Sequence, residues 1–146
     1  METLNPEYET EVRRVFSGAP FIQSLGAELV EFAPGYCRSR IQIDPHHQQQ
    51  DGFIHAGVQA TLADHTAGTA AATLIPAGKR VLTAEFKINL LRAAQGRLLC
   101  CEATVLKPGR TLIVAEAEVY AQQAQRQLVA KATVTLAVVD VERGGK

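Results

Sequence analysis

The run from residue 55 to residue 75, HAGVQATLADHTAGTAAATLI, is the feature that most limits how this chain can fold. It is rich in alanine, and Pro76 and Gly78 follow it, so we predict one long helix that ends there. Asp64 is its only full charge. Because Asp64 and His65 interrupt an otherwise weakly polar run, a helix in the protein core is favoured over a membrane span.

The residues on both sides of this helix show the two-residue alternation of β-strands. Two strands are predicted before the helix, joined by a turn at Pro34–Gly35, and four after it. Their ranges are 27–33, 36–43, 80–90, 97–107, 111–121 and 126–139. In the third strand one face is predicted to carry Leu82, Ala84, Phe86, Ile88 and Leu90, and the opposite face Thr83, Glu85, Lys87 and Asn89.

The N-terminal segment predicts a short amphipathic helix. Asn5 and Pro6 are a good helix start, and Gly18 with Pro20 is expected to end the segment. The order of elements then indicates a single α+β domain over residues 1–146, with an antiparallel sheet of about six strands wrapped around the long helix. A polar loop at 44–54 leads into that helix, and residues 141–146 are expected to be a frayed tail.

The charge balance and the cysteines limit the class of protein. Lys+Arg and Asp+Glu number 15 each, so no general attraction to nucleic acid or to an anionic membrane is expected. Cys37, Cys100 and Cys101 are an odd number, and the adjacent pair would point to opposite strand faces. Reduced thiols in a cytoplasmic protein are therefore expected, and the polar start of the chain argues against a secretory signal.

Asp64 is the first candidate for a functional group. A mid-helix aspartate is most often a solvated surface residue, but this run holds no Lys, Arg or Glu. A carboxylate in low dielectric is costly unless it has a partner, and such groups concentrate at functional sites. On a helical wheel its neighbours are all small, which would allow another chain or a ligand to approach closely: Gly57, Ala60, Thr61, Ala67, Gly68 and Ala71.

The start of the helix is the second candidate. Its first backbone N–H groups, at Ala56 and Gly57, have no partner within the helix and could bind an oxyanion. Ala56 and Asp64 are eight residues apart, or about 12 Å along one helix. A base and an oxyanion donor must both lie within about 3 Å of the groups they serve on one carbonyl centre. If both are catalytic, the site must therefore combine Asp64 of one chain with residues 56–57 of another.

The spacing Gln49–x6–Ala56–x7–Asp64, with His55 and Gly57 beside Ala56, resembles the hotdog-fold acyl-CoA thioesterases, and among them the PaaI-type (phenylacetate-degradation) group. The resemblance covers residues 20–139 and includes the segment TAEFKINLLRAAQGRLLCCEATVLKPGRT. It implies a hotdog fold, in which a sheet wraps around a central helix, as the order of elements already indicates.

The resemblance also implies catalytic roles. Asp64 would attack the thioester carbonyl or activate water, and the N–H of Ala56 would polarise the carbonyl oxygen. Gln49 would donate a hydrogen bond near the carbonyl or the water, and Thr83 would orient that water. The family usually has glycine at position 56. The alanine here keeps the N–H donor, provided that the position does not need positive φ.

Further expectations concern binding and assembly. We expect His55, Gly57 and Gly68 to contact an acyl-CoA substrate with a small or medium acyl or aryl-acyl group. The resemblance implies a homo-oligomer, at least a dimer and by analogy a tetramer built as a dimer of dimers. It implies no metal and no organic cofactor. His55 also has a structural interpretation as a residue that caps or packs at the helix start.

Other functions stay open at this stage. A hotdog hydratase or dehydratase fits less well, because Asp51 and His55 are separated by three residues where the hydratase motif has four. A non-catalytic domain that binds acyl-CoA is a third possibility. His46 and His47 are expected to be solvated loop residues. Most of five further cations are also expected to be solvated, and one or two of them would bind the phosphates of coenzyme A. They are Arg80, Lys87, Arg92, Lys107 and Arg110.

Overall fold

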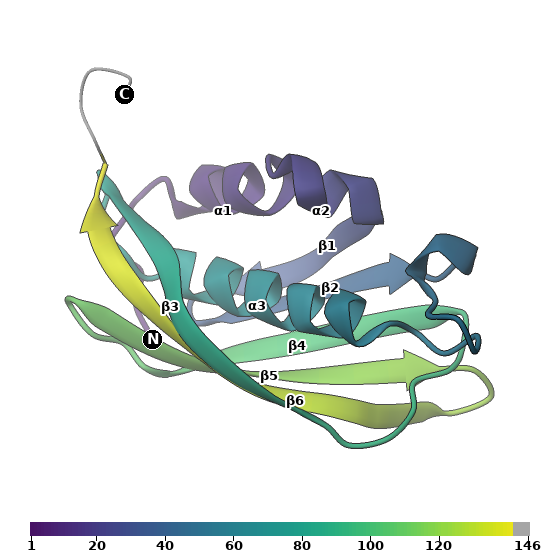
Figure 1. Ribbon diagram of the computed structural model, residues 1–146. Helices are drawn as coiled ribbons and strands as arrows, with labels where there is room; N and C mark the ends of the chain where they lie inside the picture. The colour runs from purple at the N-terminus through teal and green to yellow at the C-terminus, as the bar shows by residue number, and fades with distance from the viewer. Residues whose placement is uncertain (142–146) are drawn as a thin grey trace.

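The computed structural model describes residues 1–141. Figure 1 shows a strongly curved antiparallel sheet with one long helix against its concave face and two short helices beside that helix. The elements are α1 (Tyr8–Ser17), α2 (Pro20–Leu25), β1 (Ala27–Ala33), β2 (Tyr36–Gln42), the 3-10 turn η1 (Pro45–His47), α3 (Ala56–Ala72), β3 (Lys79–Leu90), β4 (Leu98–Lys107), β5 (Leu112–Gln122) and β6 (Arg126–Asp140). The predicted α+β architecture is confirmed, with six strands around one long helix.

The sheet has the order β1-β2-β4-β5-β6-β3, and every neighbouring pair is antiparallel. β3 therefore forms one edge of the sheet although it lies in the middle of the sequence. In the described part of the chain, no helix is both long and apolar enough to cross a membrane.

Small side chains let α3 lie close to the sheet. Ala63, Ala67 and Ala70 are fully buried on the helix, and the strands beneath it carry buried alanines such as Ala115 and Ala117. Close approach of backbones raises the packing density and the number of dispersion contacts. The alanine content of this run therefore follows from its place at the centre of the core.

One polar link also joins α3 to the sheet. The hydroxyl groups of Thr66 and Ser39 are 2.6 Å apart and both are buried, so each satisfies the other. Cys101 is buried on the inner face of the sheet and Cys100 is half-buried, as their adjacent positions on a strand predict. All three cysteines are free thiols.

A β-bulge in β3 contradicts the predicted alternation of that strand. Thr83 pairs with Leu136 of β6 and Glu85 pairs with Thr135, so Ala84 is an extra residue without a partner on β6. Because Leu136 is buried on the inner face, Thr83 also faces inward, like Phe86 two pairs further along. The prediction that Thr83 faces away from Phe86 is therefore wrong: a bulge reverses the phase of a strand, and a regular two-residue pattern contains no sign of it.

The N-terminal region also differs from the prediction. α1 begins at Tyr8, because the Asn5 side chain accepts the N–H of Glu7 and forms a turn before the helix starts. Pro20 does not end a helical segment but begins α2, where it occupies the first turn. Proline is favoured in the first turn because a backbone N–H there has no acceptor within the helix, so its absence costs nothing.

The loop before α3 buries a histidine that was predicted to be solvated. His47 is 2% exposed; its Nδ1 accepts the N–H of Asp44 at 3.1 Å and its Nε2 donates to Leu25 O at 2.7 Å. The ligand atoms of Asp44, His46 and His47 lie within 4.8 Å of one another. Both ring nitrogens of His47 are already engaged, however, so this ring serves as a structural link and has no lone pair left for a metal.

At the C-terminus, Val141 donates its N–H to Gly78 O at 3.0 Å and so closes the pairing of β3 with β6. The rest of the segment predicted to be a frayed tail lies outside the described residues.

Candidate active site

Asp64 lies in the middle of α3, half-buried, and faces strand β3. The Thr83 hydroxyl donates a hydrogen bond of 2.7 Å to Asp64 Oδ1. The bulge at Ala84 gives Thr83 this inward orientation, and bulges often redirect a side chain in this way beside a functional site. The hydrogen bond fixes one carboxylate oxygen and leaves the other free to face a ligand.

A cavity of about 310 Å³ opens beside Asp64. It is bounded by α2, α3 and β3 and is mostly apolar; its lining residues are Ala19, Phe21, Ile22, Ala60, Thr61, Asp64, His65 and Phe86. Phe21, Ile22 and Phe86 were not predicted from the sequence to be site residues. The helix that carries Phe21 and Ile22 was not predicted. Pro20 in its first turn is the sequence feature that could have indicated it.

His65 lies in the same cavity and joins α3 to the end of α1. Its Nε2 donates to Phe16 O at 3.1 Å, and its ring packs on the Phe16 ring with 4.8 Å between centroids. Burial lowers the pKa of His65; the hydrogen bond to Phe16 and the charge of Asp64 oppose this only in part. The imidazole beside Asp64 is therefore neutral at neutral pH.

This lowered pKa predicts a pH dependence of stability. The folded state binds the proton of His65 more weakly than the unfolded state, so His65 favours folding above its unfolded pKa, and that contribution is lost as the pH falls below it. Between about pH 7.5 and 5.5, thermal unfolding should show a larger fall in Tm for the wild type than for His65→Gln, which keeps a donor but does not titrate. Equal falls in Tm would contradict this role of His65.

The first turn of α3 offers one free backbone donor. His55 is the N-cap, and its Nδ1 accepts the N–H of Gly57 at 2.8 Å. No acceptor within residues 1–141 takes the N–H of Ala56, which is exposed. The N–H of Ala56, rather than that of Gly57, is therefore the group available to an oxyanion. The position does not need positive φ, so alanine costs nothing here relative to glycine.

The capping contact confirms the structural interpretation of His55, and it also accounts for Gly57. A Cβ atom at position 57 would lie 3.0 Å from His55 Nδ1 and would press on the cap. Because Nδ1 accepts this hydrogen bond, Nε2 is the ring nitrogen of His55 that can donate one.

A stability measurement tests the cap. His55→Ala should lower the free energy of unfolding by about 1 kcal/mol, because one N–H at the start of α3 loses its partner. His55→Asn should retain most of that stability, since asparagine is among the best N-cap residues. Denaturant unfolding of the three proteins provides the comparison. If His55→Asn were as unstable as His55→Ala, the cap would not be the source of the loss.

Gln49 precedes this helix start in the same loop. Its Oε1 accepts the backbone N–H groups of Asp51 and Phe53, which fixes which end of the amide is oxygen. The amide Nε2 of Gln49 has no acceptor in the described part of the chain. A side-chain donor and the backbone donor of Ala56 therefore flank the same loop–helix junction.

Within one chain the candidate residues form two separate groups. Asp64 and Thr83 meet at the middle of α3, and Gln49, His55, Ala56 and Gly57 lie at its start. The groups are about 12 Å apart along the helix. Gly68 belongs to neither group, since it faces β6, where a Cβ would lie 3.5 Å from Leu136 Cδ2.

Known proteins match this chain in both sequence and fold. A sequence model of the thioesterase superfamily matches residues 51–127, which include Asp64 and the whole of α3. A crystal structure of a thioesterase family protein from Silicibacter pomeroyi is 38% identical, with a TM-score of 0.89, and the match covers 92% of this chain and 99% of that one. The chain therefore belongs to the thioesterase superfamily and has its hotdog fold.

Two curated relatives are more distant. The 1,4-dihydroxy-2-naphthoyl-CoA hydrolase of Listeria monocytogenes is 24% identical over 114 residues, or 78% of this chain and 93% of that protein. An esterase candidate of Halobacterium salinarum is 32% identical over 103 residues, or 65% of this chain and 66% of that protein. The class, a thioester hydrolase, agrees with the resemblance in the sequence. None of these matches distinguishes the PaaI-type group, which stays a prediction.

Proposed function

We propose that this protein hydrolyses an acyl-CoA thioester in a site that two chains share. Asp64 and Thr83 of one chain would meet Gln49 and the N–H of Ala56 of the other. The observation that carries the proposal is the separation of two incomplete half-sites along α3: a hydrogen-bonded carboxylate at its middle and an unpartnered donor at its start. Each half lacks what the other supplies.

The exposed edge of the sheet supports a dimer. β3 is a 12-residue edge strand, and large apolar side chains on it and just after it are exposed: Leu82, Phe86, Leu90 and Leu91. A long apolar edge strand invites pairing with another strand. The opposite edge, β1, has seven residues and carries Glu28 and Glu31 in ion pairs with β2. Pairing of β3 with its copy about a twofold axis is the proposed dimer contact, and a dimer of dimers is the proposed tetramer.

In the proposed reaction the thioester carbonyl oxygen receives hydrogen bonds from Ala56 N–H and Gln49 Nε2. Asp64 takes a proton from a water molecule, whose oxygen bonds to the carbonyl carbon. The resulting oxyanion collapses, the C–S bond breaks, and the thiolate of coenzyme A leaves and is protonated. Thr83 holds the carboxylate in place for this step. The chemistry uses only side chains, a backbone donor and water.

Direct attack by Asp64, with a mixed anhydride as intermediate, is the alternative route within the same function. Hydrolysis in ¹⁸O-labelled water distinguishes the two routes. Label in the Asp64 carboxylate after several turnovers supports the anhydride, and label in the acid product alone supports attack by water.

A panel of thioesters tests the function itself. Release of free thiol should be measured for acyl-CoA substrates from short straight-chain to phenylacyl and hydroxybenzoyl, because the apolar cavity beside Asp64 suits small or medium groups. Hydration of an enoyl-CoA without thiol release would show a hydratase instead. Tight binding without either reaction would show a non-catalytic domain.

Three free cysteines fit a reducing compartment, and we propose that the protein is located in the cytoplasm.

A further inference from the structure

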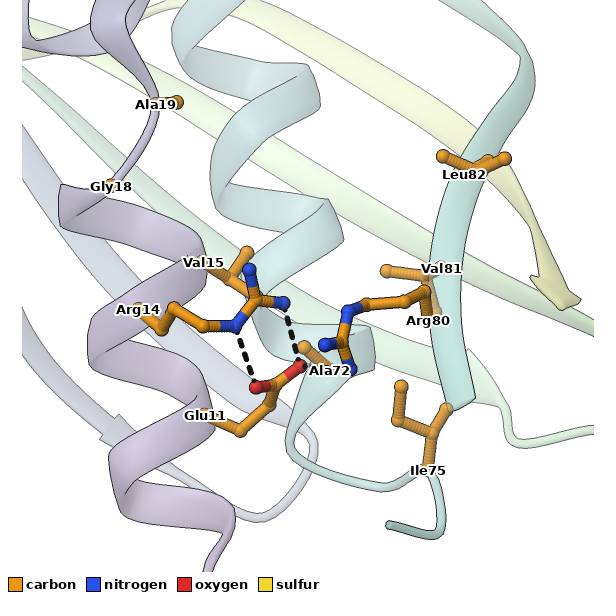
Figure 2. A pocket seen from close by; sticks show the side chains of 10 residues that line it. All are labelled: Glu11, Arg14, Val15, Gly18, Ala19, Ala72, Ile75, Arg80, Val81 and Leu82. Atoms are coloured by element: carbon orange, nitrogen blue, oxygen red, sulfur yellow. Dashed lines mark hydrogen bonds and ion pairs between the residues drawn. The ribbon is translucent and has the colours of Figure 1, made fainter. Parts of the chain in front are cut away.

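A second cavity, of about 400 Å³, lies between α1 and β3, beside the C-terminal end of α3 (Figure 2). Its walls are mainly apolar or small, and it contains three charged side chains: Glu11 and Arg14 from α1, and Arg80 from the start of β3. Figure 2 shows the two guanidinium groups pointing toward the space between the helix and the strand, with the Glu11 carboxylate between them.

The charges in this cavity do not balance. Glu11 accepts two hydrogen bonds from Arg14, at 2.8 and 2.9 Å, and one from Arg80 at 3.1 Å. The hydrogen bond from Arg14 is the main reason why the pKa of Glu11 is lowered, so Glu11 is ionised at neutral pH. One carboxylate therefore faces two guanidinium groups, and the lining has an excess of one positive charge.

Arg80 has donors left for a ligand. Its Nη1 serves both Glu11 and Lys79 O, while no acceptor in the described chain takes its other N–H groups. A guanidinium presents five N–H donors in a fixed plane, which suits a carboxylate. Arg80 was expected to be one of several surface cations, and it lines a cavity instead.

The cavity adjoins the one beside Asp64. Ala19 lines both, and Leu82, which lines the second, directly precedes Thr83 on β3. From Thr83 back to Arg80 is three residues of strand, or about 10 Å. The two cavities therefore lie in succession along β3, with Asp64 beside one and Arg80 beside the other.

We propose that the acyl chain runs from the cavity beside Asp64 past Ala19 into this second cavity and that Arg80 with Arg14 binds a carboxylate at its far end, so that the preferred substrates are ω-carboxyacyl thioesters. This inference rests on the proposed thioesterase function. The mostly apolar lining of both cavities fits the methylene chain, and the uncompensated guanidinium charge fits the terminal anion, which a charge-assisted hydrogen bond would hold.

The test compares suberyl-CoA with octanoyl-CoA, which differ only in a terminal carboxylate in place of a methyl group. For Arg80→Gln, the ratio of kcat/KM for suberyl-CoA over octanoyl-CoA should fall by about ten- to hundredfold. For Glu11→Gln, which removes the competing carboxylate, the ratio should rise. Lys131→Gln removes a cation that pairs with Glu116 and Glu118 on β5, and it should leave the ratio unchanged.

Two other results would overturn the inference. If Arg80→Gln and Glu11→Gln both leave the ratio unchanged, the cluster only ties α1 to β3. If Arg80→Gln weakens both CoA esters equally but not the N-acetylcysteamine thioesters of the same acids, the cluster binds the phosphates of coenzyme A. Calorimetric Kd values for the two CoA esters provide the same ratio without turnover. A protein that binds suberyl-CoA more tightly through Arg80 but hydrolyses no thioester would retain this inference and lose the proposed function.

Discussion

Replacement of Asp64 by asparagine is expected to reduce kcat by about 10²- to 10⁴-fold on any acyl-CoA that the wild type hydrolyses, with little change in KM. The asparagine has nearly the same shape and still accepts the hydrogen bond from Thr83, which is 2.7 Å long in the wild type. It can neither take a proton from water nor attack a carbonyl. The loss therefore reports chemistry rather than folding, and steady-state thiol release measures it.

Asp140→Asn is the matched control for this experiment. It makes the same chemical change at the end of β6, where Asp140 pairs with Lys79 on the surface. It should leave kcat unchanged. Light scattering should show one oligomeric state for the wild type and both variants. A near-normal kcat for Asp64→Asn on a good substrate would remove Asp64 from the mechanism.

Replacement of Ala56 by proline is expected to reduce kcat by about 10²- to 10³-fold, because it removes the one backbone N–H assigned to the oxyanion. The helix should tolerate the change. Ala56 is the first helical residue, where proline is favoured, and His55 before it has φ −60° and ψ 138°, which suits a residue that precedes proline. Only a donor is removed, and the thiol-release assay measures the effect.

Ala56→Gly keeps the N–H and should keep the activity, since the position does not need positive φ and glycine is the residue that the family usually has there. Circular dichroism should show the same helix content for Ala56→Pro and Ala56→Gly. If Ala56→Pro folds and turns over at the wild-type rate, another group must bind the oxyanion.

The fold was largely predictable because its main elements depend on local patterns. The strands follow two-residue alternation, and the predicted limits of all six agree with the observed limits to within one residue. The long helix follows from the alanine-rich run before Pro76 and Gly78, although it ends at Ala72, a few residues before the predicted end. These patterns involve residues that are close together in the sequence, so they can be interpreted without knowledge of the tertiary structure.

The site was only partly predictable, because several of its features depend on tertiary structure. Asp64 was found from its unusual surroundings, and Ala56 from the general chemistry of a helix start. The inward orientation of Thr83 depends on a bulge that exists only in the pairing of β3 with β6. The burial of His47 depends on Leu25, which is 22 residues away. The cavity beside Asp64 needs α2, a helix of six residues that is too short for a periodic signal.

Subunit mixing tests the central claim most directly, since Asp64→Asn and Ala56→Pro damage opposite halves of the shared site. In a mixed dimer one site carries both changes, while the other joins the intact Asp64 of one chain to the intact Ala56 of its partner. Random assortment of equal amounts, by co-expression or by refolding together, should restore about a quarter of the wild-type activity, far above either variant alone. A mixture that forms mixed dimers but stays as inactive as its parents would show that each chain holds its own complete site.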